Sequence, residues 1–102
     1  MQNAEIENIK NTFIKDISPT KIYLFGSYAT GKSTENSDID FYLIVDNEED
    51  VIELTTKAYR AIRDIKQHPV DIVIGTSDSF NRKKDIPSVE YEVDKEGVLL
   101  YG

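Results

Sequence analysis

One stretch of eight residues, Asp38 to Val45, limits the fold of this chain more than any other part of its sequence. Side chains along an extended strand point alternately to its two faces, so every second residue shares a face. One face is wholly apolar and carries Ile39, Phe41, Leu43 and Val45. The other face begins with two acids and carries Asp38, Asp40, Tyr42 and Ile44. The pattern predicts a β-strand with one buried face and two carboxylates side by side on the other.

The segment before this strand predicts a helix and a first strand. An apolar stripe at helical spacing consists of Ile6, Ile9, Phe13 and Ile17. Ser18-Pro19 ends that helix, because the residue before a proline avoids helical backbone. Lys21 to Phe25 is rich in β-branched and aromatic residues, which favours a short buried strand closed by Gly26.

The segment after the strand predicts two or three more helices and two more strands. A long helix is expected to open at Asp46 and Asn47, with Glu49 completing a capping box. Its apolar stripe consists of Val51, Leu54, Ala58, Ile62 and Ile65. We then expect a strand over 70–74 ended by Gly75, a short helix capped by Ser77 or Asp78, a helix over 88–96 ended by Gly97, and an edge strand over 98–101.

These elements predict an α/β (α+β) fold, with a small mixed β-sheet and helices packed against it. The chain has 102 residues, which is enough for one domain over 1–102 but not for two. It has 12 Lys or Arg against 19 Asp or Glu, and this net charge of −7 argues against a general nucleic-acid binder. It has no Cys, no secretion signal and no apolar stretch of membrane-spanning length, so we expect a cytoplasmic protein without a membrane anchor.

The segment Gly26–Ser33 matches the P-loop signature G-x-x-x-x-G-K-S and follows a predicted strand. In a P-loop, a helix opens at the Gly-Lys-Ser and directs its N–H groups at phosphate. Here only four residues, Thr34 to Ser37, separate the signature from the next strand, which leaves no room for that helix. The match is therefore interpreted as accidental.

A second set of residues, three aspartates near the Gly26-Ser27 turn, gives a different interpretation of the same segment. Asp38 and Asp40 leave the same face of one strand, and Asp71 interrupts the otherwise apolar strand 70–74. Like charges this close repel unless a cation joins them, and Mg²⁺ is commonly held by one or two carboxylates together with substrate phosphates. Three acids beside a Gly-Ser turn predict a two-metal phosphoryl-transfer site.

Plainer interpretations of these residues stay open. Asp38 and Asp40 would also suit the solvent face of a strand, and Asp71 would suit the protective charge of an edge strand. Ser27 is explained equally well as a turn residue. His68, the one histidine, is interpreted as a structural or solvated residue.

The motif Tyr23-Leu24-Phe25-Gly26-Ser27, then Asp38-Ile39-Asp40, then Asp71 resembles the DNA polymerase β-type nucleotidyltransferase superfamily, in its minimal nucleotidyltransferase branch. The closing segment 92–101 also resembles the end of those small domains. The resemblance covers nearly the whole chain and implies a polymerase β-like nucleotidyltransferase fold.

The resemblance implies Mg²⁺-dependent transfer of a nucleoside monophosphate, most simply AMP from ATP, with release of pyrophosphate. Asp38 and Asp40 would hold two Mg²⁺ ions, and Asp71 would ligate the catalytic ion and help deprotonate the attacking hydroxyl. Gly26 and Ser27 would bind the triphosphate. The chain departs from many relatives in having Tyr28 and Thr30 where they carry Arg. Lys32 is the candidate to supply the missing positive charge.

Minimal domains of this family commonly work with a small helical protein of the HEPN type. The pair resembles a toxin–antitoxin system in which the transferase adenylylates a tyrosine of the HEPN ribonuclease. We expect the partner to dock beside the carboxylates, with Tyr28 and Arg82-Lys83-Lys84 as candidate contacts.

Two alternatives are a transferase acting on a small hydroxyl compound such as an aminoglycoside, and an antitoxin that neutralises its partner by binding alone. The acceptor, the base preference and assembly with further copies of the chain are left open by the sequence.

Overall fold

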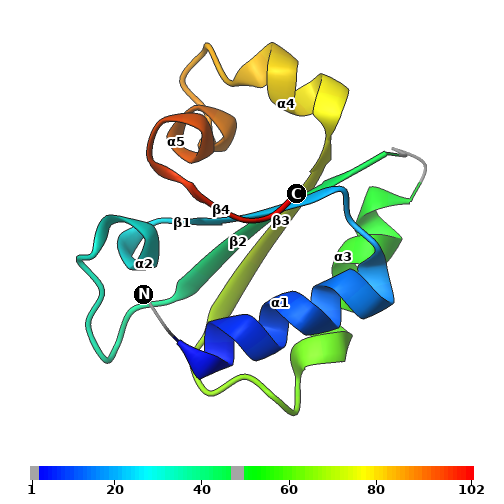
Figure 1. The fold of residues 1–102 in the computed structure, drawn as a ribbon. Helices are drawn as coiled ribbons and strands as arrows, with labels where there is room; N and C mark the ends of the chain where they lie inside the picture. Colours follow the sequence, from blue (N-terminus) through cyan, green and yellow to red (C-terminus); the bar gives the residue numbers. More distant parts are fainter. Residues whose placement is uncertain (1–2, 47–49) are drawn as a thin grey trace.

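The computed structural model describes residues 3–46 and 50–102, and within them helices alternate with strands, except that two helices follow the third strand (Figure 1). In chain order they are α1 (Ala4–Ile17), β1 (Lys21–Phe25), α2 (Ser27–Thr30), β2 (Ile39–Val45), α3 (Val51–Ile62), β3 (Val70–Thr76), α4 (Ser77–Lys83), α5 (Val89–Glu96) and β4 (Val98–Tyr101). Within the described ranges, no helix is both long enough and apolar enough to cross a membrane.

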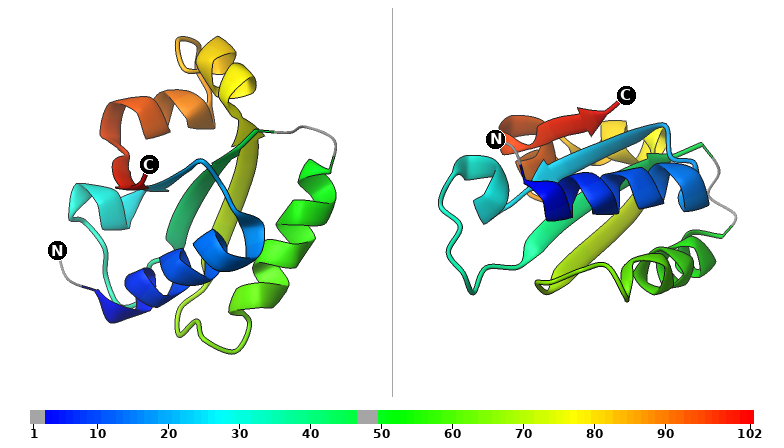
Figure 2. Two further views of the ribbon diagram at one scale, coloured as in Figure 1. Left: turned by 45° about the vertical axis from the view of Figure 1, so that its right-hand side comes forward. Right: turned by 60° about the horizontal axis from the view of Figure 1, so that its bottom comes forward.

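The four strands form one mixed sheet in the order β3-β2-β1-β4. Strand β2 runs parallel to β3 and antiparallel to β1, and β1 runs antiparallel to β4. Helices α1 and α3 cover one face of the sheet, and α4 and α5 cover the other (Figures 1 and 2). The predicted fold class, a small mixed sheet with helices packed against it, is confirmed.

The alternation along β2 assigns its side chains to these two layers as predicted. The wholly apolar face packs against α1 and α3, where Phe13 meets Phe41 edge to face at 5.3 Å between ring centroids. Tyr42 and Ile44 on the opposite face pack with residues from β1, α4 and α5, namely Phe25, Phe80 and Val93. Strand β2 is therefore buried on both sides along most of its length, and only its N-terminal end carries charge.

Helix α1 ends where the sequence predicts, at Ser18-Pro19, and both of its ends are capped. The Asn3 side chain accepts a hydrogen bond from the Ile6 N–H at 3.0 Å. Ser18 takes a left-handed conformation, with φ of 55°, and its N–H donates to the Phe13 carbonyl. Proline then prevents continuation of the helix.

Four predicted boundaries are wrong: the end of β3, the cap of α4 and both ends of α3. Strand β3 continues through Gly75 to Thr76, because the missing side chain makes room for Tyr42: a Cβ at Gly75 would lie 2.5 Å from the tyrosine oxygen. Helix α4 is capped by Thr76, whose side chain accepts from the Ser79 N–H, and not by Ser77 or Asp78.

Helix α3 ends at Ile62, so Ile65 is not part of its buried stripe and is 38% exposed. The helix begins at Val51 with Asp50 as its N-cap, so the predicted opening at Asp46 is wrong, while Asn47 and Glu49 lie outside the described residues.

Candidate active site

The two acidic strand positions meet at one end of the sheet. Strands β2 and β3 are parallel, and their register pairs Asp40 directly with Asp71. Asp38 lies two residues before Asp40, on the same face as Tyr42, which is the face that α5 covers. Asp38 and Asp71 are exposed and Asp40 is partly buried. Carboxylates from two strands are thus neighbours, as the sequence predicts.

The surroundings of Asp40 oppose its negative charge. The pKa of Asp40 is raised from 3.8 to about 6, and the largest cause is its burial. The charge of Asp71 and a hydrogen bond with the Asp71 side chain come next, and the charges of Asp38 and Glu92 add to the rise. A cation placed among these carboxylates would reverse that repulsion.

Gly26 brings the backbone of the Gly-Ser turn against Asp40. Phe25, the last residue of β1, pairs with Asp40, so the chain turns directly beside that carboxylate. Gly26 has φ of 73° and ψ of −154°, a conformation that is essentially restricted to glycine. A Cβ at this position would collide with the Asp40 carboxylate. Only glycine allows both the turn and the close approach.

A short helix that the sequence analysis missed follows this turn. Helix α2 begins at Ser27 and ends at Thr30, and its C-cap Gly31 is left-handed with φ of 77°. The N–H groups of Ala29 and Thr30 donate to the Gly26 carbonyl, so the donors that this short helix directs outward near the carboxylates are the Ser27 and Tyr28 N–H groups, beside the Ser27 hydroxyl. Within the described chain no helix opens at Lys32, and this agrees with treating the P-loop match as accidental.

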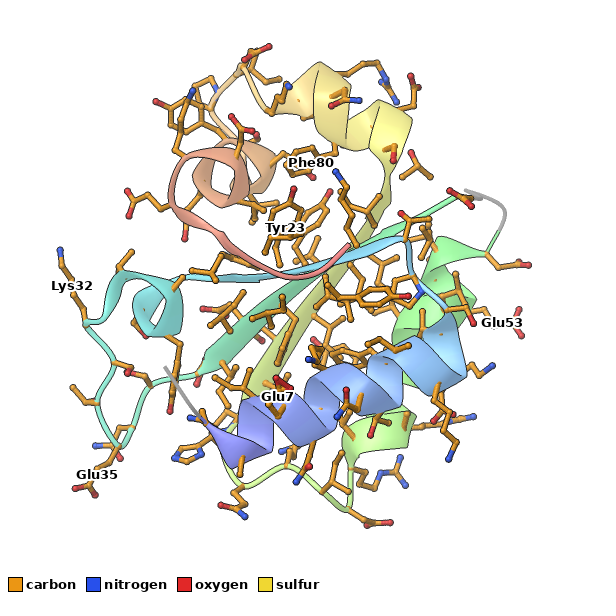
Figure 3. The ribbon with its side chains drawn as sticks, viewed as in Figure 1. Glu7, Tyr23, Lys32, Glu35, Glu53 and Phe80 are labelled. Atoms are coloured by element: carbon orange, nitrogen blue, oxygen red, sulfur yellow. The ribbon has the colours of Figure 1, made fainter. Side chains whose placement is uncertain are left out.

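Lys32 lies beyond the C-terminal end of α2 and is exposed. Its side chain points away from the body of the molecule in Figure 3. The structure therefore brings Gly26, Ser27, Asp40 and Asp71 together at one place, whereas Lys32 stands apart from them.

Of the two docking contacts suggested by the sequence, Tyr28 is wrong, and the basic cluster lies on α4. Tyr28 is buried, with 8% of its surface exposed, because it packs into the α1 side of the core and against the His68 ring. Arg82 and Lys83 form the last turn of α4 and Lys84 is its C-cap, and this helix begins directly after the far end of β3. Thr76 is five residues beyond Asp71, so the helix that carries this basic cluster starts roughly 16 Å along the strand from Asp71.

One acid near the site was missed. Glu92 is exposed on α5 and its charge acts on Asp40, although 52 residues separate them in the sequence. Spacing carries no signal for this proximity, because it depends on α5 packing across the sheet through Val93, which lies in one cluster with Phe25 and Tyr42.

The donor set suits a metal bound jointly with a substrate. Among residues 3–46 and 50–102, no three His, Cys, Asp or Glu side chains form a closed metal-binding group. Mg²⁺, however, is usually held by one or two carboxylates with substrate phosphates completing the shell. The adjacent oxygens of Asp40 and Asp71, with Asp38 nearby, fit such an open arrangement.

Comparison with known sequences and structures also indicates a nucleotidyltransferase. The family model described as polymerase beta, nucleotidyltransferase matches residues 7–102. A protein of Methanocaldococcus jannaschii, named provisionally as a protein adenylyltransferase, is 38% identical over 82 residues, which cover 79% of this chain and 77% of the relative.

Two solved structures are similar over 98% of this chain and 74% of theirs. One is a toxin-antitoxin with AMP-PNP, at 26% identity and a TM-score of 0.58. The other is a mutant of the toxin-antitoxin MntA-HpeT, at 28% identity and a TM-score of 0.62. The predicted resemblance and the predicted fold are confirmed by these matches.

Proposed function

This chain belongs to the polymerase beta nucleotidyltransferase family and is a nucleotidyltransferase, and we propose that it moves AMP from ATP to a tyrosine hydroxyl of a small helical HEPN-type toxin. The modification would silence the toxin, so the chain would act as an antitoxin. The reaction would depend on Mg²⁺, with two ions held by Asp38, Asp40 and Asp71.

The observation that carries this proposal is the pairing of Asp40 with Asp71 beside the Gly26-Ser27 turn. A carboxylate pair that repels itself is costly unless it serves a cation. The turn next to it offers backbone N–H groups and a hydroxyl, which are the donors that a triphosphate requires. A cation site and a phosphate site therefore share one end of the sheet.

In the proposed reaction, the acceptor oxygen forms a bond to the α-phosphorus of ATP while the bond from that phosphorus to the bridging α–β oxygen breaks. Asp71 accepts the proton of the attacking hydroxyl, and pyrophosphate leaves with the bonding electron pair. Gly26 and Ser27 bind and orient the triphosphate. The Mg²⁺ ions, when bound, neutralise charge on the phosphates and on the attacking oxygen.

Two comparisons support a protein acceptor. The Methanocaldococcus jannaschii relative carries the name of a protein adenylyltransferase, and two similar structures are described as toxin-antitoxin proteins, one with the ATP analogue AMP-PNP. An aminoglycoside-like small hydroxyl compound is the alternative acceptor, and inhibition of a toxin by binding alone is the non-catalytic alternative.

Mass spectrometry of the chain co-expressed with a candidate HEPN-type partner tests the proposal. We expect the partner to gain the mass of AMP on a tyrosine, and we expect no gain with Asp38→Ala or Asp40→Ala. A tight complex that binds ATP but shows no modification would support inhibition by binding. Transfer to a small hydroxyl compound without any complex would support the aminoglycoside-like alternative.

A pair of serine variants separates this function from the P-loop interpretation. We expect Ser27→Ala to weaken transfer strongly, because its hydroxyl belongs to the turn beside Asp40. Ser33→Ala should leave transfer near the wild-type rate. The reverse result, with Ser33 needed and Ser27 dispensable, would contradict the proposed triphosphate site.

A further inference from the structure

We propose that Glu5, at the start of α1, is a positioning residue that holds the Gly-Ser turn and the paired aspartates in their relative places. It does so through His68 and the loop before β3, without touching the substrate. The inference rests on the proposed function, but part of its test does not require activity. It concerns a residue that neither the motif nor the spacing of the acids singles out.

The Glu5 carboxylate is saturated by one short loop. Its Oε2 accepts hydrogen bonds from the N–H groups of Gln67 and His68 at 2.5 and 2.9 Å, and its Oε1 lies 2.6 Å from Nδ1 of His68. The Glu5 side chain is only 6% exposed. Burial alone would raise its pKa, but the bonds from Gln67 and His68 outweigh burial and lower the pKa. The buried carboxylate is thus held ionised by three contacts with two consecutive residues.

From this loop, one connection leads to the Gly-Ser turn. The His68 ring meets the Tyr28 ring edge to face, with 6.4 Å between centroids and 70° between planes. Tyr28 is buried on α2 and directly follows Ser27. The orientation of α2, and with it the Ser27 donors, therefore depends on where the His68 ring lies.

A second connection leads to the aspartates. The Pro69 carbonyl accepts a hydrogen bond at 2.9 Å from the N–H of Ile39, the residue between Asp38 and Asp40. Two residues after Pro69 the chain reaches Asp71, which pairs with Asp40. The loop that Glu5 holds is therefore the point at which the two acidic strands are brought into register.

The buried Glu5 carboxylate is not needed to attach α1 to the sheet. Ile9, Phe13 and Ile17 already bury α1 against the sheet, and Asn3 already caps it. An ionised carboxylate in such a place carries a desolvation cost, and here its three bonds all go to the loop that leads into Asp71. A displacement of about 1 Å among reacting groups is enough to slow transfer by up to a hundredfold.

The test compares Glu5→Gln with Glu7→Gln, both measured well below their melting temperatures. Glu7, labelled in Figure 3, is on the same helix, but its side chain is 57% exposed and forms an ion pair with Lys10. The first measurement is NMR of the protein without metal or nucleotide, following the Ile39 amide and the Tyr28 ring protons. The second measurement is AMP transfer with saturating ATP and Mg²⁺.

We expect Glu5→Gln to shift both NMR signals and to lower kcat at least tenfold, while Glu7→Gln leaves the signals in place and changes kcat less than twofold. A folded Glu5→Gln with wild-type signals and wild-type kcat would overturn the proposal and leave Glu5 a stability residue only. If the wild type transfers nothing, the proposed function fails, and the NMR comparison still decides the positioning role. If Glu5→Gln does not fold, His68→Phe is measured instead, because it keeps both backbone bonds of Glu5; an unmoved Tyr28 ring would then overturn the proposal.

Discussion

Two acids in this small domain, Glu5 and Asp40, are both withdrawn from water and yet have opposite surroundings. Glu5 accepts hydrogen bonds from Gln67 and His68, and these lower its pKa despite burial. Asp40 meets Asp71 and other acids, and burial and repulsion raise its pKa to about 6. The protein therefore completes the environment of one carboxylate and leaves the other dependent on a positive charge from outside.

The different surroundings of the two carboxylates indicate a structural role for Glu5 and a chemical role for Asp40. A carboxylate whose donors come from the chain stabilises the folded state above its pKa. A carboxylate whose neighbours are also acidic destabilises the metal-free protein, and such an arrangement is typical of sites that bind a ligand. Each of the following predictions tests one side of this contrast.

The largest expected effect is on catalysis. Asp40→Asn keeps the shape of the side chain and removes its charge, so we expect transfer to fall on the order of a hundredfold or more. Asp46→Asn is the matched control, because Asp46 follows the other end of the same strand and is exposed. Transfer rates are measured with excess ATP and Mg²⁺. Wild-type transfer by Asp40→Asn would remove Asp40 from the active site.

The next largest effect concerns the glycine that Asp40 rests against. Gly26→Ala adds a Cβ where the Asp40 carboxylate lies and forces alanine into a conformation restricted to glycine. We expect a loss of about 2–3 kcal/mol in the free energy of unfolding. Gly31→Ala is the control, because Gly31 has a similar φ but open space around its Cβ, and it should cost about 1 kcal/mol. Urea unfolding measures both variants, and equal losses would mean that contact with Asp40 adds nothing.

The fold was largely predictable because its signals are local. The stripe of α1, the Ser18-Pro19 stop and the alternation of β2 each follow from neighbouring residues, and all are found in the structure. The predicted strand end at Gly75 is wrong because the role of this glycine depends on Tyr42, which belongs to another strand. The short helix α2 was missed because four residues carry no periodicity.

The candidate site was predictable only where the spacing of residues along the sequence determines it. The pairing of Asp40 with Asp71 follows once both strands are recognised, whereas the proximity of Glu92 arises only from packing. The burial of Tyr28 against His68 could not be predicted from the sequence either, because a tyrosine after a turn motif is expected to be exposed unless its packing partner is known.

A smaller effect concerns the stability that Glu5 provides. Glu5→Ala leaves the N–H groups of Gln67 and His68 without their acceptor, so we expect a loss of about 2 kcal/mol at pH 7. Because the folded pKa of Glu5 lies below its ordinary 4.5, this stability is present above pH 4.5 and is lost as pH falls through the folded pKa. Glu7→Ala, which breaks only a surface pair with Lys10, should cost under about 0.5 kcal/mol. Equal losses for both variants at pH 7 would contradict the view that Glu5 is the satisfied acid.

The smallest effect, and the one with the opposite sign, is the stability of Asp40→Asn without metal. The folded pKa of Asp40 is raised from 3.8 to about 6, so its cost to the folded state grows as pH rises between these values and is constant above them. Asparagine has no such cost, and we expect it to stabilise the protein by about 1 kcal/mol at pH 7.5, a modest gain because water screens a partly buried group. At pH 4 the gain should nearly vanish, because the wild-type carboxyl is then mostly protonated in the folded state.

Urea unfolding in EDTA at both pH values measures this difference, with Asp46→Asn expected to show no such rise. A variant that is less stable than the wild type at pH 7.5 would mean that the chain satisfies Asp40 as it satisfies Glu5, and the contrast between the two acids would be lost.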